Sequence, residues 1–440
     1  MAWTSFPVDR FQGAIRAPGD KSCSHRALML AGAAAGVSEI SGLLEGEDVI
    51  NTARAMQALG AEVEQTAPGR WRIEGTGKTG LRSPSAPLDF GNSGTGSRLM
   101  MGLMAGYDLR AELTGDKSLS SRPMARITDP LKLMGAKFAP EGRDKLPLTL
   151  SGRADLTPIS YAPKQASAQV KSAILLAGLN ADGLTEVTEL YATRDHTERM
   201  LRSFGVDVAV RAGKGSQNVV TIEGGQSLQA VETSIPGDPS SAAFLIAGAL
   251  ISPSGGVIVE HIMSNATRDG FFQAAGHMGA GLGAEETGDG AGERLVDLQA
   301  ETSDLKGCEI PETLVAAMID EFPILAVIAA FAKGETRVRG AEELRVKESD
   351  RISAIVAMLR VNGVEVEEHE DGFTVMGCDG PPPGGGLVET HHDHRIAMSA
   401  LVMGTASQKP VAVDDIAMIA TSYPEFLDHM RTLGADIRET

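Results

Sequence analysis

The stretch Pro18–Gly36, PGDKSCSHRALMLAGAAAG, decides how this 440-residue chain folds. It joins a Gly-Asp turn and a group of polar residues to a run of small apolar residues that is long enough for a buried helix. The stretch looks like a phosphate cradle, but it lacks the first glycine of the nucleotide motif GxxxxGK[ST]. Because the free N–H groups at a helix start favour anions, it predicts an anion site that is not a nucleotide P-loop.

Apolar runs of the same kind recur along the chain. Six runs rich in Ala, Leu and Met begin near Ala27, Leu99, Ile174, Phe244, Ile324 and Ile396. A second, interleaved series reads as a helix end, a glycine suited to positive φ and an alternating strand, with its glycines at Gly60, Gly135, Gly205, Gly279, Gly363 and Gly434. Two series in step predict six copies of a mixed helix and strand unit of about seventy residues.

The six copies divide into two groups of three. The stretch PGDPSSAAFLIAGAL from Pro236 matches the one from Pro18, so each opens one half of the repeats. If the chain passes between domains at these points, residues 1–20 and 237–440 form one domain and residues 21–236 form the other. We therefore expect two similar α/β domains of three units each, with helices packed inside and sheets outside.

Composition limits the class of ligand. The formal net charge of −18 argues against general binding of nucleic acids or anionic membranes, and 4% aromatic residues give no sign of base stacking. The three cysteines form neither a disulfide framework nor a metal-binding spacing. No signal peptide core and no apolar run of transmembrane length is present. These features are typical of a soluble cytoplasmic protein, in which an anionic ligand would need a local cationic pocket.

Ionisable residues gather where the apolar helices begin. Capping alone accounts for GDPSSA, but it does not account for Lys21 with Arg26 or for the sequence Asp393-His394-Arg395. Other helices also open with charge, in SSRPMAR, TRDHTER and LRVKESDR. A solvated helix face is the ordinary meaning of such runs.

The run LRVKESDR has a spacing that suits chemistry. Lys347 and Arg351 lie one helical turn apart, with Glu348 beside them. This arrangement can clamp a carboxylate or a phosphate while a carboxyl group works nearby.

Two further patterns contain reactive residue types. The sequence HHDHR (His391–Arg395) contains metal-binding residue types, but four such residues in a row rarely converge on one ion. Cys23 lies close to Lys21, which can lower a thiol pKa and make a nucleophile, although a cysteine at a helix start is more often a small buried residue. We therefore expect neither a metal site nor a cysteine nucleophile.

Seven motifs in order along the whole chain resemble the 5-enolpyruvylshikimate-3-phosphate synthase family (3-phosphoshikimate 1-carboxyvinyltransferases). They are PGDKSCSHRAL, GNSGTGSR, GDKSLSSRPM, ASAQVKSAILLAGL, PGDPSSAAF, LRVKESDR and DHRIAMSALVMG, and further details look like the bacterial class II subgroup. The resemblance implies two inside-out α/β domains, each of three βαβαββ units, with an active site in the cleft between them. It also implies transfer of the enolpyruvyl group of phosphoenolpyruvate to the 5-hydroxyl of shikimate 3-phosphate, without metal or organic cofactor.

The resemblance also carries site residues over, motif by motif. It implies that shikimate 3-phosphate is bound by Lys21, Ser22, Arg26, Ser167, Ala168, Gln169, Arg194, Asp320 and Lys347. It implies that phosphoenolpyruvate is bound by Lys21, Gly94, Arg122, Gln169, Arg351 and Arg395. The implied catalytic residues are Asp320, which accepts the hydroxyl proton, Glu348, which delivers and removes the methylene proton, and Lys21. These cations suit two substrates that together carry about five negative charges.

The chain departs from the class I pattern of this family at one position. Class I members have a lysine where this chain has Thr421, to which we assign no catalytic role. The family inhibitor glyphosate should fit, because Gly94 leaves room where some class II members have alanine.

Two other functions fit the sequence less well. A UDP-N-acetylglucosamine enolpyruvyl transferase would need a cysteine in the loop GDKSLSSRPM, which has none. A non-catalytic scaffold would have no reason to place charged residues together at helix starts. We expect a cytoplasmic monomer.

Overall fold

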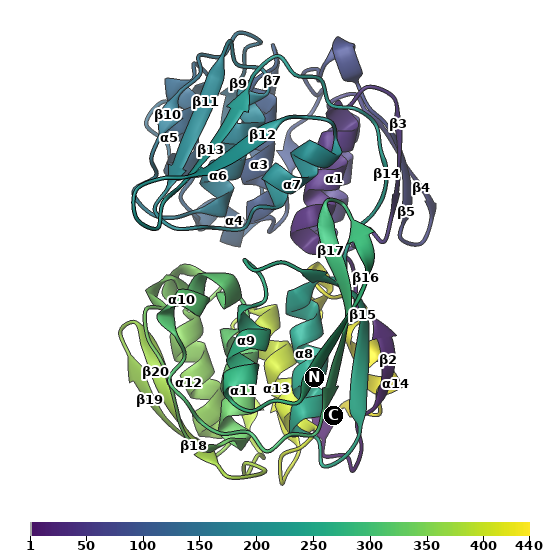
Figure 1. Ribbon diagram of the computed structural model, residues 1–440, viewed down its shortest axis with the longest axis vertical. Coiled ribbons are helices and arrows are strands. Elements are labelled where there is room, and N and C mark those ends of the chain that lie inside the picture. The colour runs from purple at the N-terminus through teal and green to yellow at the C-terminus, as the bar shows by residue number, and fades with distance from the viewer. Residues whose placement is uncertain (1) are drawn as a thin grey trace. The chain divides into compact units, whose positions relative to one another are not determined.

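The computed structural model describes residues 2–440, except for the side chain of Lys78, and it divides into two compact units (Figure 1). Unit 1 comprises Met1–Pro18, Gly237–Gly288 and Arg294–Thr440, and unit 2 comprises Gly19–Pro236 and Asp289–Glu293. Met1, the first residue of the expected domains, lies outside the described residues. The segment 289–293, which the sequence did not point out, belongs to unit 2 although both of its neighbours along the chain belong to unit 1.

Unit 2 contains three four-stranded sheets with one common pattern. The sheets are β14(Glu232–Ser234)-β3(Val37–Ser41)-β5(Arg70–Glu74)-β4(Glu62–Ala67), β6(Leu88–Asp89)-β7(Arg110–Thr114)-β9(Leu148–Ser151)-β8(Lys137–Ala139) and β10(Ser160–Tyr161)-β11(Leu184–Glu189)-β13(Asn218–Glu223)-β12(Val208–Ala212). In each sheet the first two strands are parallel and the other pairs are antiparallel. Because β14 comes from the end of the unit and pairs with β3 near its start, it completes the first repeat.

The helices of unit 2 follow the same repetition. The buried ones are α1(Lys21–Ala33), α3(Gly94–Ala105) and α6(Ala168–Gly178), and the others are α2(Glu47–Ala58), η1(Gly77–Thr79), α4(Lys117–Ser121), α5(Ala125–Leu133) and α7(His196–Ser203). Ser, Asp or Asn side chains are common caps, and here Asp20, Ser93 and Ser167 cap the three buried helices. The polar groups that precede each apolar run are therefore held at a helix start.

Unit 1 repeats this plan with its own strands and helices. Its sheets are β16(Leu282–Gly290)-β17(Glu293–Glu301)-β15(Gly256–Ser264)-β2(Gly13–Arg16), β18(Lys333–Val338)-β20(Gly372–Cys378)-β19(Glu365–His369) and β21(Leu387–Val388)-β22(Val411–Val413)-β1(Trp3–Phe6)-β23(Asp436–Glu439). Its helices are α8(Pro239–Ile251), α9(Gly270–His277), α10(Glu312–Val315), η2(Ala316–Met318), α11(Phe322–Phe331), η3(Glu342–Val346), α12(Arg351–Val361), α13(His394–Gly404), η4(Ala417–Thr421) and α14(Phe426–Thr432).

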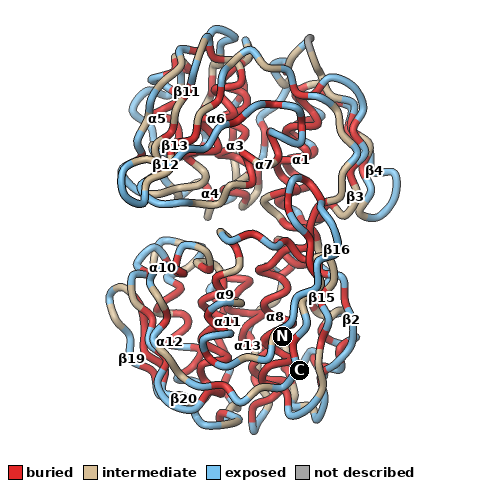
Figure 2. The backbone as a smooth tube through the Cα atoms, in the orientation of Figure 1, coloured by how far each residue is buried: buried red, intermediate tan, exposed pale blue. Residues whose placement is uncertain are grey.

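The six apolar runs form the cores of the two units. Every residue of α8, α11 and α13 is buried, and α1, α3 and α6 are buried along nearly their whole length (Figure 2). An apolar helix without a polar face is stable only when it is covered on all sides, and here sheets and outer helices cover it. The expected fold class, α/β units with helices inside and sheets outside, is confirmed.

The six glycines of the second series also take the predicted conformation. All have positive φ, between 76° for Gly363 and 113° for Gly60. Each follows the end of an outer helix, where a left-handed residue lets the chain turn back into a strand without a Cβ clash. These glycines therefore recur in the sequence because the backbone needs a positive φ at the same point of each repeat.

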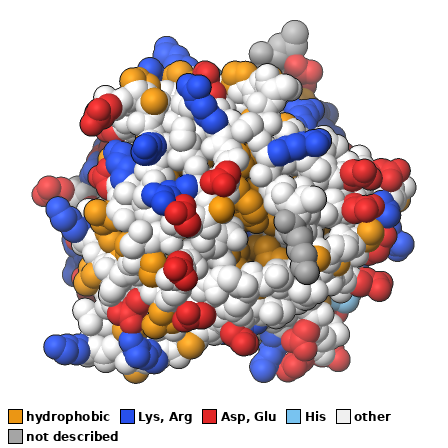
Figure 3. All heavy atoms as spheres, turned by 90° about the horizontal axis from the view of Figure 1, so that it is seen from above, with side chains coloured by type: hydrophobic (Ala, Val, Ile, Leu, Met, Phe, Trp, Pro, Cys, Tyr) orange, Lys and Arg blue, Asp and Glu red, His pale blue; other side chains and the backbone are white. Residues whose placement is uncertain are grey.

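Two features of the surface and the helices bear on the class of ligand. On the face drawn in Figure 3, acidic and basic side chains are interspersed rather than gathered into one basic patch. Among the helices of residues 2–440, none combines the length and the apolar character needed to cross a bilayer.

Candidate active site

In unit 2, the start of α1 places three predicted ligands of shikimate 3-phosphate together. Asp20 caps the helix by accepting from the backbone N–H of Cys23 at 2.7 Å. Nearly buried Arg26 donates from Nε to Thr197 Oγ1 at 2.7 Å and from Nη1 to the carbonyl of Ser22 at 2.9 Å. Lys21 Nζ, which is partly exposed, lies 3.2 Å from Asp48 Oδ2. Lys21 and Ser22 therefore remain at the surface while Arg26 anchors the turn beneath them.

This turn has a positive electrostatic environment. Burial, together with the charges of Lys21 and Arg26, lowers the pKa of His25 to about 3. The neutral ring lies between the second turn of α2 and the start of α3, with Nδ1 2.8 Å from Thr52 Oγ1 and Nε2 3.3 Å from Ser93 Oγ. The ring stays neutral mainly because it is buried, and the charges of Lys21 and Arg26 add to this effect.

The start of α3 forms a second cationic group. Gln169 Oε1 accepts from Arg98 at 3.0 Å and from Arg126 at 3.3 Å. Arg122 donates to the side chain of Asn92 at 2.6 Å. Sequence reasoning missed Arg98 and Arg126, although Arg98 ends the motif GNSGTGSR one helical turn after Gly94 and so lies on the same face of α3.

The starts of α6 and α7 are joined under this surface by a buried charge cluster. Lys171 Nζ lies 3.0 Å from Glu189 and 2.7 Å from Glu198, and all three side chains are almost fully buried. Burial raises the pKa of Glu198, against the opposite effect of Lys171. The cluster fixes the start of α6, with Ser167, Ala168 and Gln169, against the loop that carries Arg194, because breaking a buried pair leaves an uncompensated charge.

In unit 1, the side chain of Arg351 is the centre of the site. It lies 3.1 Å from Asp320 Oδ1 and 2.8 Å from Asp393 Oδ2, and it also forms an ion pair with Glu348. Burial alone would lower the pKa of Arg351, but the carboxylates of Asp393, Glu348 and Asp320 raise it. Burial alone would raise the pKa of Asp393, but the charge and hydrogen bond of Arg351 together with His394 outweigh it, and the pKa is lowered. One arginine thus orients both predicted proton-transfer residues, Asp320 and Glu348.

Arg395 and Lys347 lie beside this group. Arg395 Nη1 donates to the backbone carbonyl of Asp320 at 3.0 Å and lies 3.7 Å from Glu321. Lys347 Nζ lies 3.2 Å from Glu343 Oε1. Sequence reasoning missed the role of Asp393, which caps α13 and pairs with Arg351. Its place in the motif DHR was the only signal available.

The predicted residues therefore form two groups. Unit 2 holds Lys21, Ser22, Arg26, Gly94, Arg122, Ser167, Ala168, Gln169 and Arg194, and unit 1 holds Asp320, Lys347, Glu348, Arg351 and Arg395. In the motif HHDHR, His391 and His392 are exposed on a left-handed turn while Asp393 is buried against Arg351, so these side chains do not converge on one ion. Thr421 donates to the backbone carbonyl of Met418 at 2.7 Å.

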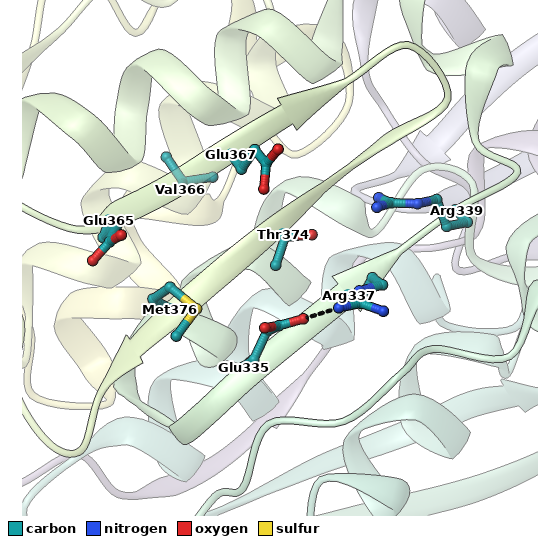
Figure 4. Close-up of a pocket in the computed structure, with 8 residues that line it drawn as sticks. All are labelled: Glu335, Arg337, Arg339, Glu365, Val366, Glu367, Thr374 and Met376. Carbon is teal, nitrogen blue, oxygen red and sulfur yellow. Dashed lines mark hydrogen bonds and ion pairs between the residues drawn. The ribbon is translucent and has the colours of Figure 1, made fainter.

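The pocket drawn in Figure 4 is separate from both groups. It is a hollow of about 210 Å³ over the sheet β18-β20-β19, and its lining residues are Glu335, Arg337, Arg339, Glu365, Val366, Glu367, Thr374 and Met376. Arg337 pairs with Glu335 at 2.6 Å along the strand β18 that forms one side of the hollow. None of the predicted site residues lines this hollow, whose character is that of a charged, solvated sheet surface.

A sequence model of the family described as EPSP synthase (3-phosphoshikimate 1-carboxyvinyltransferase) matches residues 7–430. The chain belongs to this family. It is 66% identical to a 3-phosphoshikimate 1-carboxyvinyltransferase of Hyphomonas neptunium over the full length of both chains. It is 52% identical to the enzyme of the same name from Parvibaculum lavamentivorans, covering 98% of this chain and 96% of that one.

Solved structures agree with the family assignment. The structure is similar to that of an EPSP synthase from Acinetobacter baumannii, with a TM-score of 0.89 and 40% identity, covering 100% of both chains. The resemblance drawn from the seven motifs is therefore confirmed, and the two alternatives, a UDP-N-acetylglucosamine transferase and a non-catalytic scaffold, are set aside. Family membership also confirms the two-domain inside-out architecture.

Proposed function

We propose how this chain carries out the reaction of its family, in which the enolpyruvyl group of phosphoenolpyruvate moves to the 5-hydroxyl of shikimate 3-phosphate and phosphate is released. The reaction is a step of the shikimate pathway, which leads to aromatic amino acids. The observation that carries the proposal is the division of chemistry between the two groups of residues. One group is rich in cations at helix starts, and the other holds two carboxylates on one arginine.

The group in unit 2 binds most of the substrate charge. Shikimate 3-phosphate is bound by Lys21, Ser22 and Arg26, by Ser167, Ala168 and Gln169 at the start of α6, and by Arg194. Phosphoenolpyruvate is bound by Lys21, Gly94, Arg122 and Gln169 of unit 2 and by Arg351 and Arg395 of unit 1. Guanidinium groups pair with phosphate and carboxylate in bidentate geometry, which fixes the orientation of both substrates.

The group in unit 1 moves the protons. Glu348 gives a proton to the methylene carbon of phosphoenolpyruvate, which leaves C2 electron-poor. The 5-hydroxyl attacks C2 while Asp320 accepts its proton, and Lys347 contacts the shikimate 3-phosphate. The tetrahedral adduct then expels phosphate, which takes up the proton held by Asp320, and Glu348 removes a methyl proton. The double bond is restored, and both the acid and the base are regenerated.

Several finer features belong to the same proposal. Both groups act on the same two substrates, so the domain formed by residues 21–236 and the domain formed by residues 1–20 and 237–440 must complete one site on substrate binding. Neither a metal nor an organic cofactor takes part. Glyphosate competes for the phosphoenolpyruvate site. The enzyme is a cytoplasmic monomer, which its negative charge and its cysteine pattern support.

Phosphate release tests the proposal directly. The purified chain is mixed with both substrates in the presence of EDTA, and free phosphate and the enolpyruvyl product are measured. We expect stoichiometric release with shikimate 3-phosphate and none with UDP-N-acetylglucosamine as acceptor. Release that needs a metal, or that occurs only with the sugar nucleotide, would contradict it.

A further inference from the structure

A buried cluster in unit 2 joins three residues that are far apart in the sequence. The Sγ of Cys23, a ring nitrogen of His196 and a carboxylate oxygen of Glu293 all lie within 4.8 Å of one another. All three residues are completely buried. Neither the phosphate-binding residues nor the proton-transfer residues described above account for this cluster.

Glu293 is the unusual member, because it comes from the segment 289–293. This segment belongs to unit 2, whereas the strands that it connects continue into unit 1. Its carboxylate lies 2.8 Å from Nδ1 of His196 and 3.4 Å from Nε of Arg199. A carboxylate can only accept, so His196 donates from Nδ1 to Glu293.

The backbone of the same segment is packed closely against unit 2. The N–H of Ala291 donates to Thr233 Oγ1 at 3.0 Å. A Cβ added to Gly292 would lie 2.7 Å from Ser203 Oγ and 2.9 Å from the carbonyl of Arg199, so only glycine fits against the end of α7. The segment is therefore seated by its backbone as well as by Glu293.

The other two members of the cluster adjoin residues that are proposed to bind phosphoshikimate. Cys23 directly follows Ser22 in the first turn of α1, and His196 lies two residues after Arg194 at the start of α7. A shift of either helix start would therefore move a substrate ligand. The two starts meet through buried side chains beneath them, such as Arg26 with Thr197.

We propose that Cys23, His196 and Glu293 form a positioning network, in which the segment 289–293 holds the starts of α1 and α7 in register for shikimate 3-phosphate. The inference rests on the proposed function for the roles of Ser22 and Arg194. It makes the phosphoshikimate half of the site depend on a segment whose flanking strands lie in unit 1. Residues 19–236 alone would lack this support.

Two other uses of the cluster fit the surroundings less well. A divalent metal ion would sit in the positive field of Arg26, which interacts with Cys23, and of Arg199, which contacts Glu293. A nucleophilic role for Cys23 would require substrate to reach a side chain with 0% exposure. Neither objection applies to a network that only positions its neighbours.

Substrate binding gives the first test. Glu293→Ala removes the acceptor of His196 and one of the two carboxylates near Arg199, which keeps its bond to Asp195. Glu285→Ala is the matched control, because Glu285 is an exposed residue of the same hairpin. We expect the Kd for shikimate 3-phosphate, measured by calorimetry, to rise about tenfold or more in Glu293→Ala and to stay unchanged in the control. The KM for phosphoenolpyruvate should change much less. Equal Kd values for all three proteins would overturn the inference.

Thiol labelling gives a second test that does not depend on substrate. Cys378 is exposed, Cys308 is partly buried and Cys23 is buried, so the chain contains its own reference thiols. In Glu293→Ala, we expect Cys23 to react with a thiol reagent at least about tenfold faster while the other two rates stay constant. Faster labelling of all three would mean general loss of structure, and unchanged labelling of Cys23 would show that segment 289–293 does not hold it.

The two tests separate failure of the inference from failure of the proposed function. If the unmodified protein does not bind shikimate 3-phosphate, the proposed function fails, yet selective labelling of Cys23 still demonstrates the network. If the unmodified protein binds and Glu293→Ala binds equally well, only the inference fails. Tight one-to-one binding of Zn²⁺ to the unmodified protein, lost in Glu293→Ala, would overturn it by making the cluster a metal site.

Discussion

Arg98 and Arg122 in unit 2 differ from Arg351 in unit 1 in the kind of side chain that they contact. In unit 2, Arg98 and Arg122 donate to the side-chain oxygens of Gln169 and Asn92, which are neutral. In unit 1, Arg351 is surrounded by carboxylates, including Asp320. Neutral partners orient a guanidinium group and leave its charge available to a ligand, whereas carboxylates compensate that charge. These contacts support the proposal that unit 2 binds the substrate anions and that unit 1 holds the acids in place.

A second contrast lies in the two stretches that open the halves of the repeat. Both place an aspartate at a helix cap, Asp20 before α1 and Asp238 before α8. Asp238 also pairs with buried Arg268 at 2.8 Å, while the helix that follows Asp20 opens with partly exposed Lys21. The same backbone motif therefore packs against a buried arginine in unit 1, whereas in unit 2 it presents Lys21, for which we propose a substrate contact.

Lys21→Ala should have the largest effect on activity. Loss of this cation removes a contact to both substrates, so we expect kcat/KM to fall about 10³-fold or more. Pro239→Ala is the matched change at the start of α8 and should retain most of the activity, because it removes no charge. Steady-state kinetics of both variants checks the contrast. Equal losses of kcat/KM in the two variants would mean that the start of α1 has no special role in substrate binding compared with the start of α8.

Glu348→Gln tests the acid in unit 1. The amide keeps the size of the side chain but cannot transfer a proton, so we expect turnover to fall about 10²-fold or more. Binding of shikimate 3-phosphate should persist, since its charge is met by unit 2. The control is Glu343→Gln, which changes an exposed carboxylate beside Lys347. Near-normal turnover of Glu348→Gln would assign the acid to another residue.

Gly94→Ala sharpens the description of the cationic group. Gly94 lies in the first turn of α3 and its φ is not in the left-handed region, so the backbone tolerates alanine. The new Cβ would lie 2.8 Å from Arg98 Nη1 and 3.2 Å from Arg122 Nη1, which crowds the phosphoenolpyruvate end of the site. We expect glyphosate affinity to fall by about tenfold or more, with a smaller change for phosphoenolpyruvate and no loss of stability.

Inhibition constants for both proteins and a thermal unfolding curve check this expectation. If the unmodified enzyme tolerates glyphosate, the expectation that Gly94 leaves room for this inhibitor is wrong. Parallel losses of stability and of both affinities would instead show that Gly94 is required by the turn.

We expect the smallest effect on catalysis from substitution of His25, because this residue affects the stability of the fold and its dependence on pH. The pKa of this residue is lowered to about 3 in the folded chain, mainly by burial and then by the charges of Lys21 and Arg26. The unfolded chain therefore binds the proton first as pH falls, and stability that is present above about pH 6.5 is lost as pH falls toward 3. Between pH 7 and pH 5 this amounts to about 2 kcal/mol.

His25→Gln should reduce the loss of stability over that interval by about this amount. Urea unfolding of both proteins at the two pH values measures the difference. An identical pH dependence would show that the histidine is protonated in the folded chain, in conflict with an electropositive turn.

Much of the architecture was predictable from sequence because its signals are local. An apolar run without a polar face demands burial, and a glycine between helix and strand marks a left-handed residue. Gly60 and Gly434 illustrate this, since both have the positive φ that the pattern predicted. The predicted ligands at helix starts were found there for the same reason, as caps and first-turn residues are set by adjacent sequence.

Other parts of the site could not be read from sequence, because they depend on pairs brought together by folding. Arg98 and Arg126 donate to Gln169 from two different helices, and no residue near Gln169 in the sequence indicates these contacts. The pairing of Asp393 with Arg351 likewise joins the starts of two helices in adjacent repeats. Sequence proximity carries no information on such contacts.

The sequence by itself determined the buried helices and the turns, because each follows from a short local pattern of residues. It also determined the repeat and the family, because such patterns recur in order along the chain. Only the tertiary structure decided which charges are compensated and which face a ligand, since that depends on neighbours such as Asp48 beside Lys21. It alone also placed Glu293 against His196, 97 residues away in the chain. The physical reason is that the pairing energy of a charge depends on distance and burial in space, neither of which a linear pattern specifies.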